Sequence, residues 1–169
     1  MAEETKRTLI LLRHAKSEWP EDVPDHDRPL AKRGRRDAPT VGRWLHRHGY
    51  QPDVVVCSTA RRTRETWELV STALSETPQP AVTFEPRAYG ASAQTLLYLV
   101  RELGPDTHCA LLIAHNPGIS ELAAALAGTH RNEIGFPTAG VAVLEFSGEW
   151  PDLALGQARL ASFTIPSQM

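Results

Sequence analysis

The chain has 169 residues, of which 41% are hydrophobic and 22% are charged. One domain over residues 1–169 is expected, because a domain averages roughly 150 residues. The apolar runs are too short to span a bilayer, and the start lacks the apolar core of a secretory signal. We therefore expect no membrane contact and a cytoplasmic location. The formal net charge is −2, but residues 1–64 hold 14 Lys and Arg against 9 Asp and Glu, so an anion is expected to bind there.

The two cysteines argue against a disulfide-stabilised protein and against a Cys/His metal site. Cys57 and Cys109 are too few for a disulfide framework, and no spacing of Cys and His typical of a metal site accompanies them. Both are interpreted as reduced core residues. Neither a metal nor a cofactor is expected.

Strand-like and helix-like segments alternate along the chain. Strands are predicted from short runs of aliphatic and β-branched residues at 8–12, 53–57, 81–84, 110–114, 141–146 and 158–163. Helices are predicted at 32–48, after Ser58 or Thr59 as far as Leu74, at 92–103, and from Pro117 to Leu126 with Asn116 as N-cap. Residues 17–29, rich in Pro and acidic residues, predict a long surface loop. This alternation predicts an α/β three-layer sandwich with a mostly parallel central sheet flanked by helices.

Polar residues follow three of the predicted strands. Arg13 and His14 end the first, Arg62 begins the helix after the second, and His115 ends the fourth. Ligands of such sheets bind at the carboxyl ends of the strands, so two imidazoles and two guanidiniums are expected to converge on one pocket. Guanidinium groups match phosphate oxygens, and a neutral imidazole is a nucleophile toward phosphorus. The arginines would supply the positive charge that a metal ion supplies elsewhere.

Four motifs together resemble a known family. Arg-His-Ala-Lys-Ser-Glu-Trp at 13–19 resembles the Arg-His-Gly-x-Ser-x-Trp signature of the histidine phosphatase superfamily, also called phosphoglycerate-mutase-like. Residues 58–66 resemble its Ser-x-x-x-Arg-x-x-x-Thr motif, and residues 114–118 its Gly-His-Asn segment. Asp-Arg-Pro-Leu at 27–30 with Arg-Gly-Arg at 33–35 is similar to the SixA-type phosphohistidine phosphatases. The resemblance covers nearly the whole chain and implies a phosphoglycerate-mutase-like fold.

The resemblance implies a metal-independent phosphatase. His14 would be the phosphorylated nucleophile, with Arg13, Arg62 and His115 around the phosphate. The implied substrate is phosphohistidine on a signalling or phosphotransfer protein, and the product is inorganic phosphate. A phosphatase of small phosphate esters or of other phosphoproteins is the alternative, and a phosphopeptide-binding module is the alternative without catalysis.

This chain departs from the family pattern next to the nucleophile. Ala15 stands where the family has Gly, and Pro20 replaces an Asn that donates to phosphate in the mutases. Candidate substrate contacts are Ser17, Arg61 and Asn116.

The residue that protonates the leaving group is left open. The family commonly places a Glu or Asp after the third strand, where this chain has Glu85. Asp25 and Asp27 in the long loop are alternatives. A phosphoramidate has a leaving group that is easily protonated, so an undefined acid favours phosphohistidine as substrate.

Other phosphatase classes lack their motifs. A Cys-x5-Arg loop starting at Cys57 would need Arg at position 63, which is Thr63. Asp25-His26-Asp27 has the spacing of an aspartyl phosphatase motif but does not follow an apolar strand.

A binding module could use the basic residues of 32–36 against nucleic acid or an acidic protein, and a pI of about 6.4 argues against nucleic acid.

Overall fold

The central element of the protein is a six-stranded sheet. The computed structural model describes residues 5–74, 79–129 and 135–169. The strands lie in the order β3-β2-β4-β1-β5-β6. Their bounds are β1 Lys6–Arg13, β2 Val54–Ser58, β3 Ala81–Glu85, β4 Cys109–Ala114, β5 Val141–Ser147 and β6 Arg159–Thr164. Each predicted strand is therefore present, with ends shifted by two residues at most.

The prediction of a mostly parallel sheet is confirmed, because three of the five neighbouring strand pairs are parallel. The strands β1, β2, β3 and β4 pair in parallel, whereas β5 is antiparallel to both β1 and β6. Parallel neighbours need helical crossovers, and the predicted helices supply these for the first four strands. A connection without an α-helix joins β5 to β6, which accounts for their antiparallel pairing.

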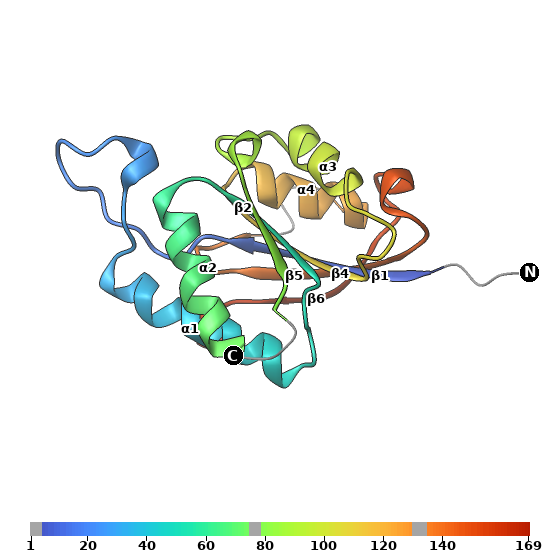
Figure 1. Ribbon diagram of the computed structural model, residues 1–169, viewed down its shortest axis with the longest axis horizontal. Coiled ribbons are helices and arrows are strands. Elements are labelled where there is room, and N and C mark those ends of the chain that lie inside the picture. Colours follow the sequence, from blue (N-terminus) through green and yellow to red (C-terminus); the bar gives the residue numbers. More distant parts are fainter. Residues whose placement is uncertain (1–4, 75–78, 130–134) are drawn as a thin grey trace, which may run out of the picture.

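In the described part of the chain, α-helices cover both faces of the sheet (Figure 1). One layer consists of α1 (Lys32–Arg47) and α2 (Arg61–Leu74), and the other of α3 (Ala93–Arg101) and α4 (Gly118–Ala127). Along β1, Leu9 and Leu11 pack under α3 and α4, while Ile10 and Leu12 pack under α1 and α2. A strand buried on both faces has such an unbroken apolar sequence. The predicted three-layer sandwich is confirmed.

Local differences from the prediction occur at element ends. The fourth helix was predicted to begin at Pro117 with Asn116 as N-cap, but α4 begins at Gly118 and Pro117 is its N-cap. The Asn116–Pro117 peptide is cis, and the carbonyl of His115 accepts a hydrogen bond from Ile119 N–H at 2.9 Å. Among the residues described, no helix is both long and apolar enough to cross a membrane.

Candidate active site

Two histidines meet where the parallel strands end. His14 follows β1 and His115 follows β4, and the parallel pairing of these strands places them side by side. The backbone N–H of His14 donates to the carbonyl of Ala114 at 3.2 Å. The two imidazole centroids lie 5.3 Å apart, and both residues are only 7% exposed.

The His14 ring is neutral and oriented by its own backbone. Burial, with smaller contributions from the charges of His115, Arg62 and Arg13, lowers its pKa from 6.5 to about 3. Its Nδ1 lies 2.8 Å from the carbonyl oxygen of Ala15, which can only accept, so Nδ1 carries the proton. The lone pair is therefore on Nε2, which has no hydrogen-bond partner among the described residues.

His115 is oriented by β2. Its Nε2 lies 2.8 Å from the hydroxyl of the buried Ser58, at the end of that strand. Burial, followed by the charge of Arg62, lowers the His115 pKa from 6.5 to about 4. Its Nδ1 is buried without a partner.

Two arginines border the histidines. Arg13, the last residue of β1, donates from Nη1 to the carbonyl of Phe136 at 3.0 Å. Arg62, in the first turn of α2, donates from Nη1 to the carbonyl of Asp25 at 2.8 Å and from Nη2 to its carboxylate at 3.1 Å. Burial and then the charge of Arg62 lower the pKa of Arg13, so the two guanidiniums repel each other.

Several buried polar atoms of this cluster lack a partner. Arg13 Nε, Arg62 Nε and His115 Nδ1 are buried without a hydrogen bond. A buried donor left unpaired costs about 1–3 kcal/mol, and two neighbouring cations add repulsion. A bound anion would relieve both, because it supplies acceptors and negative charge together.

The long loop contributes Asp25 to the cluster. Its carboxylate accepts from Arg62, from Arg28 Nη1 at 3.0 Å and from the hydroxyl of Tyr89. These hydrogen bonds, that of Tyr89 first, hold the pKa of Asp25 well below its usual range. Asp25 is therefore ionised, and it anchors the loop to Arg62.

His26 and Tyr89 were not assigned to the site from the sequence. The Tyr89 ring lies 5.6 Å from the His115 ring and 4.8 Å from the His26 ring, edge-on in both cases. His26 Nε2 lies 2.9 Å from Thr59 Oγ1, so the loop crosses to the start of α2. His26 lies in a segment without periodicity, so only its position between Asp25 and Asp27 could have drawn attention to it.

Thr66 explains the spacing of the second motif. It lies one turn after Arg62, and its hydroxyl donates to the Arg62 carbonyl at 2.7 Å. The same hydroxyl accepts from the N–H of Ala15 at 3.0 Å, directly after the histidine of the first motif. The Arg-x-x-x-Thr spacing thus joins α2 to the loop after β1.

Ser17 and Trp19 support the loop. The Ser17 hydroxyl is buried and accepts from Arg28 Nη2 at 2.6 Å. Trp19 is 76% exposed, and the Arg28 guanidinium lies 3.3 Å from the centroid of its ring. In this arrangement Ser17 positions Arg28.

The other predicted site residues have partners of their own. Glu85 binds Arg87 at 2.7 Å, which lowers its pKa, the opposite of what a proton donor requires. The Asp27 side chain is 60% exposed and its carboxylate lies 3.6 Å from His26. Arg61 is exposed and pairs with Glu65 one turn later on α2. Asn116 donates to the Phe136 carbonyl at 2.8 Å, the same oxygen that Arg13 binds.

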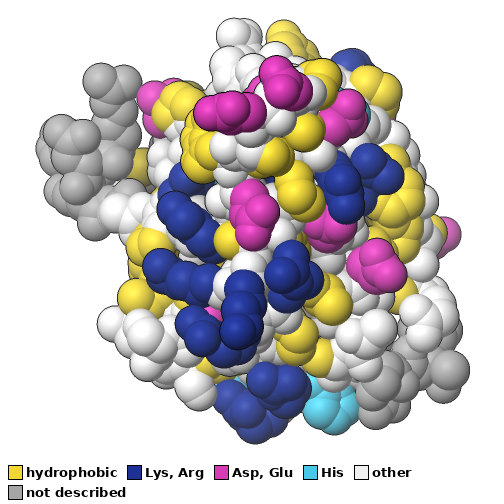
Figure 2. Space-filling view, turned by 90° about the vertical axis from the view of Figure 1, so that its left-hand side faces the viewer, with side chains coloured by type: hydrophobic (Ala, Val, Ile, Leu, Met, Phe, Trp, Pro, Cys, Tyr) yellow, Lys and Arg dark blue, Asp and Glu magenta, His cyan; other side chains and the backbone are white. Residues whose placement is uncertain are grey.

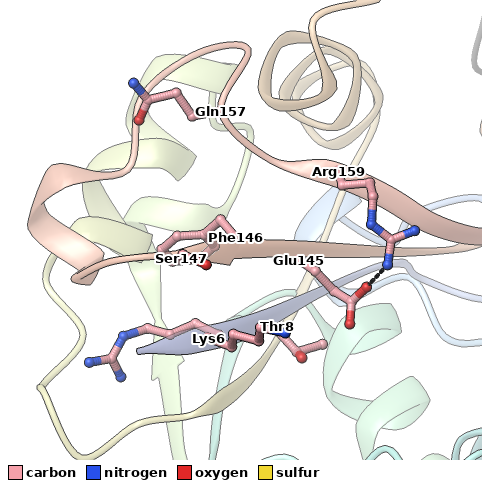
Figure 3. A pocket seen from close by; sticks show the side chains of 8 residues that line it. Lys6, Thr8, Glu145, Phe146, Ser147, Gln157 and Arg159 are labelled. Atoms are coloured by element: carbon pink, nitrogen blue, oxygen red, sulfur yellow. Dashed lines mark hydrogen bonds and ion pairs between the residues drawn. The ribbon is translucent and has the colours of Figure 1, made fainter. Parts of the chain in front are cut away.

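A groove of about 700 Å³ is present at the start of β1, the end of the strand away from His14. Figure 3 shows the side chains that line it. The groove is lined by the start of β1, the end of β5 and the start of β6, including Lys6, Glu145 and Arg159. Arg159 forms an ion pair with Glu145, and the buried guanidinium of Arg7 is held by Gly148 and Glu149. Arg7, Glu145 and Arg159 in this groove are therefore already paired, unlike Arg13 Nε and Arg62 Nε beside His14.

Comparison with known proteins agrees with the motifs. The model of the histidine phosphatase superfamily, branch 1, matches residues 9–94. An uncharacterized protein of Mycobacterium tuberculosis is 38% identical over 163 residues, which cover 92% of this chain and 99% of that protein. A SixA structure from Nakamurella multipartitia has a TM-score of 0.85 and 32% identity, covering 98% of this chain and 99% of that one.

A second SixA structure, from Agrobacterium tumefaciens, has a TM-score of 0.81 and 28% identity and covers 95% of this chain and 98% of that one. The similarity thus spans all three layers of the sandwich. The chain belongs to branch 1 of the histidine phosphatase superfamily and has the phosphoglycerate-mutase-like fold.

Proposed function

We propose that this protein is a phosphatase in which His14 is the nucleophile. His14 Nε2 attacks phosphorus, an N–P bond forms, and the bond from phosphorus to the leaving group breaks. Water then attacks the phosphohistidine, which releases inorganic phosphate and restores the neutral imidazole. Arg13, Arg62 and His115 bind the phosphoryl oxygens and stabilise the charge that develops on them.

One observation carries this proposal. The neutral His14 ring has its proton on Nδ1, which donates to the Ala15 carbonyl, so the lone pair on Nε2 has no protein partner. The nearby donors Arg13 Nε and Arg62 Nε also have no partner. A nucleophile needs a free lone pair, and a phosphate site needs unused donors. Both are present within one cluster.

The arginines support a mechanism that does not depend on a metal ion. Arg13 and Arg62 carry two positive charges next to His14, as their effects on its pKa indicate. Positive groups fixed in a site shielded from water neutralise a transferring phosphoryl group without reorganisation. Turnover is therefore expected to persist in EDTA.

The carboxylates around the site favour phosphohistidine as substrate. An alkoxide leaving group needs a proton from an acid whose pKa is raised. Asp25 and Glu85 both have lowered pKa values, and their oxygens are bound by arginines. An imidazole leaving group accepts a proton more readily, so the proposed substrate is phosphohistidine on a signalling or phosphotransfer protein. Small phosphate esters and other phosphoproteins remain the alternative substrates.

The test is phosphate release in EDTA from a histidine-phosphorylated peptide and from an aryl phosphate. The wild-type protein is compared with His14→Ala and with His108→Ala. His108 is an exposed histidine directly before β4. We expect turnover of the peptide in the wild type and in His108→Ala, with loss in His14→Ala. Turnover of the aryl phosphate alone would move the substrate class to esters. Activity that survives in His14→Ala would overturn the proposal.

A further inference from the structure

Lysine and arginine side chains gather on the face of the molecule where α1 and α2 begin (Figure 2). Beside the candidate active site, this basic surface comprises Lys16, Lys32, Arg33 and Arg36. Three of them lie in the first turns of α1, and Lys16 follows His14 by two residues. All four are exposed.

The charges of this surface oppose the electrostatics of the helices that carry them. The N-terminus of a helix is its positive end and favours acidic side chains. Neither α1 nor α2 has an acidic residue in its first turn, and no side chain caps α1 at Ala31. The first turn of α2 holds Arg61, Arg62 and Arg64 instead. Cationic side chains at the positive ends of two helices repel the helix dipoles in the free protein. A bound anion would offset this repulsion.

Most of these cations are not used within the protein. In the described part of the chain, the side chains of Lys16, Lys32 and Arg36 have no hydrogen bond or ion pair. Arg33 lies 3.4 Å from the carboxylate of Asp37, and its side chain is 61% exposed. The surface therefore has at least three positive charges available to a partner.

The surface adjoins the site directly. An added Cβ at Gly34 would lie 2.1 Å from the Lys16 carbonyl oxygen, so the start of α1 packs against the backbone just after His14. Arg33 and Arg36 also line a groove of about 380 Å³ with Pro137 and Thr138. The next residue, Ala139, donates to the carbonyls of Arg13 and His14. The groove and the candidate active site thus share the segment that follows Phe136.

We propose that this basic surface docks an acidic segment of the phosphorylated protein while its phosphoryl group enters the site at His14. The proposal rests on the proposed phosphatase function and adds to it the kind of protein that is recognised. Charge complementarity of this kind accelerates association and weakens as salt is added. Nucleic acid is the competing polyanion, and the overall net charge of −2 favours a protein over it.

The test variant is the double substitution Lys32→Gln and Arg36→Gln, which leaves the groups around His14 in place. Its matched control is Arg47→Gln with Arg159→Gln, which removes the same charge from the end of α1 and from β6. The test variant should melt at the same temperature as the wild type or higher, because it removes cations from a positive helix end. A purely structural role of these residues would instead lower its melting temperature.

The substrates are two phosphohistidine peptides of equal length, one flanked by Asp and Glu and one by neutral residues, and an aryl phosphate. At low salt we expect the test variant to raise KM for the acidic peptide by about tenfold, and the control to leave it unchanged. KM for the neutral peptide and for the aryl phosphate should not change. Equal KM values for the two peptides in the wild type would overturn the docking proposal.

A second readout separates docking from the phosphatase proposal. The unphosphorylated acidic peptide should inhibit aryl phosphate turnover in the wild type and less in the test variant. This inhibition would support docking even if neither phosphopeptide were hydrolysed, a result that would contradict only phosphohistidine as substrate. Equal inhibition of both proteins would overturn docking. Stronger inhibition by an oligonucleotide of the same charge would also overturn it, in favour of nucleic acid.

Discussion

Arg62 donates two hydrogen bonds to Asp25, one to its backbone carbonyl at 2.8 Å and one to its carboxylate at 3.1 Å. The two residues lie 37 positions apart, one on α2 and one in the loop after β1. With both terminal nitrogens of Arg62 engaged, its guanidinium is held in one orientation beside the histidines. Asp25 therefore acts as a positioning residue for Arg62.

The substitution Asp25→Asn should impair turnover by misplacing Arg62. The amide keeps the size of the side chain but removes the charge that holds Arg62, Arg28 and the Tyr89 hydroxyl. We expect kcat/KM to fall by about 10- to 100-fold, or about 1.4–2.8 kcal/mol in transition-state stabilisation. The steady-state kinetics of an aryl phosphate give this value.

Asp27→Asn is the matched control for this loop, because Asp27 is exposed and does not contact Arg62. It should change kcat/KM by less than about twofold. A large loss in Asp27→Asn together with normal activity in Asp25→Asn would contradict the role of Asp25.

Acidification tests the two buried histidines. The pKa values of His14 and His115 lie near 3 and 4, below the ordinary 6.5, because burial disfavours the charged ring. Their imidazole resonances should therefore show no protonation between pH 8 and pH 5 in an NMR titration. Titration of His14 near pH 6.5 would show that the ring is not shielded as described.

The same shifts have a consequence for stability. Below pH 6.5 the unfolded chain binds protons at these two histidines that the folded chain does not bind. Their contribution to the free energy of unfolding is therefore fully present above pH 6.5. It is lost progressively as the pH falls toward 3, because protonation then favours the unfolded chain. In His14→Gln, chemical denaturation should show a weaker decline over this interval. A pH dependence identical to that of the wild type would contradict the lowered pKa of His14.

Much of the fold is predictable from the sequence because both faces of the sheet are buried. Apolar runs such as Leu9–Leu12 and Ala110–Ala114 have no polar alternation, and strands are the short elements that bury such runs. The convergence of His14 and His115 follows from the parallel pairing of β1 with β4. The direction of β5 could not be predicted, because it depends on which edge of the sheet the chain returns to.

The long loop after β1 limits prediction of the site. Its path is set by tertiary contacts, namely Asp25 with Arg62, His26 with Thr59 and Arg28 with Ser17. No periodicity distinguishes Asp25 from Asp27 in the sequence, although one anchors Arg62 and the other is exposed. Tyr89 likewise contacts the site from the segment after β3, where the sequence drew attention to Glu85.

Gly34 is expected to be essential for the approach of α1 to the loop after β1. In Gly34→Ala the new methyl group would overlap the Lys16 carbonyl oxygen, a backbone atom that cannot rotate away. The free energy of unfolding should fall by about 1–3 kcal/mol, and turnover should fall because Lys16 lies two residues from His14. Thermal melts and aryl phosphate kinetics measure these two effects.

Gly104→Ala is the control for this substitution, since an added Cβ there meets no atom within 4 Å. Its free energy of unfolding should change by no more than about 0.5 kcal/mol. Equal effects of the two substitutions would show that the close contact at Gly34 is unimportant.

The most direct measurement is to trap the phosphorylated protein. A labelled phosphohistidine peptide is mixed with the protein, the reaction is stopped in alkali, and the labelled residue is located by peptide mapping. The label should be on His14, be stable in alkali and labile in acid, persist in His108→Ala and be absent in His14→Ala. Label on another residue, or steady turnover without any label on His14 in a rapid quench, would contradict His14 as the nucleophile.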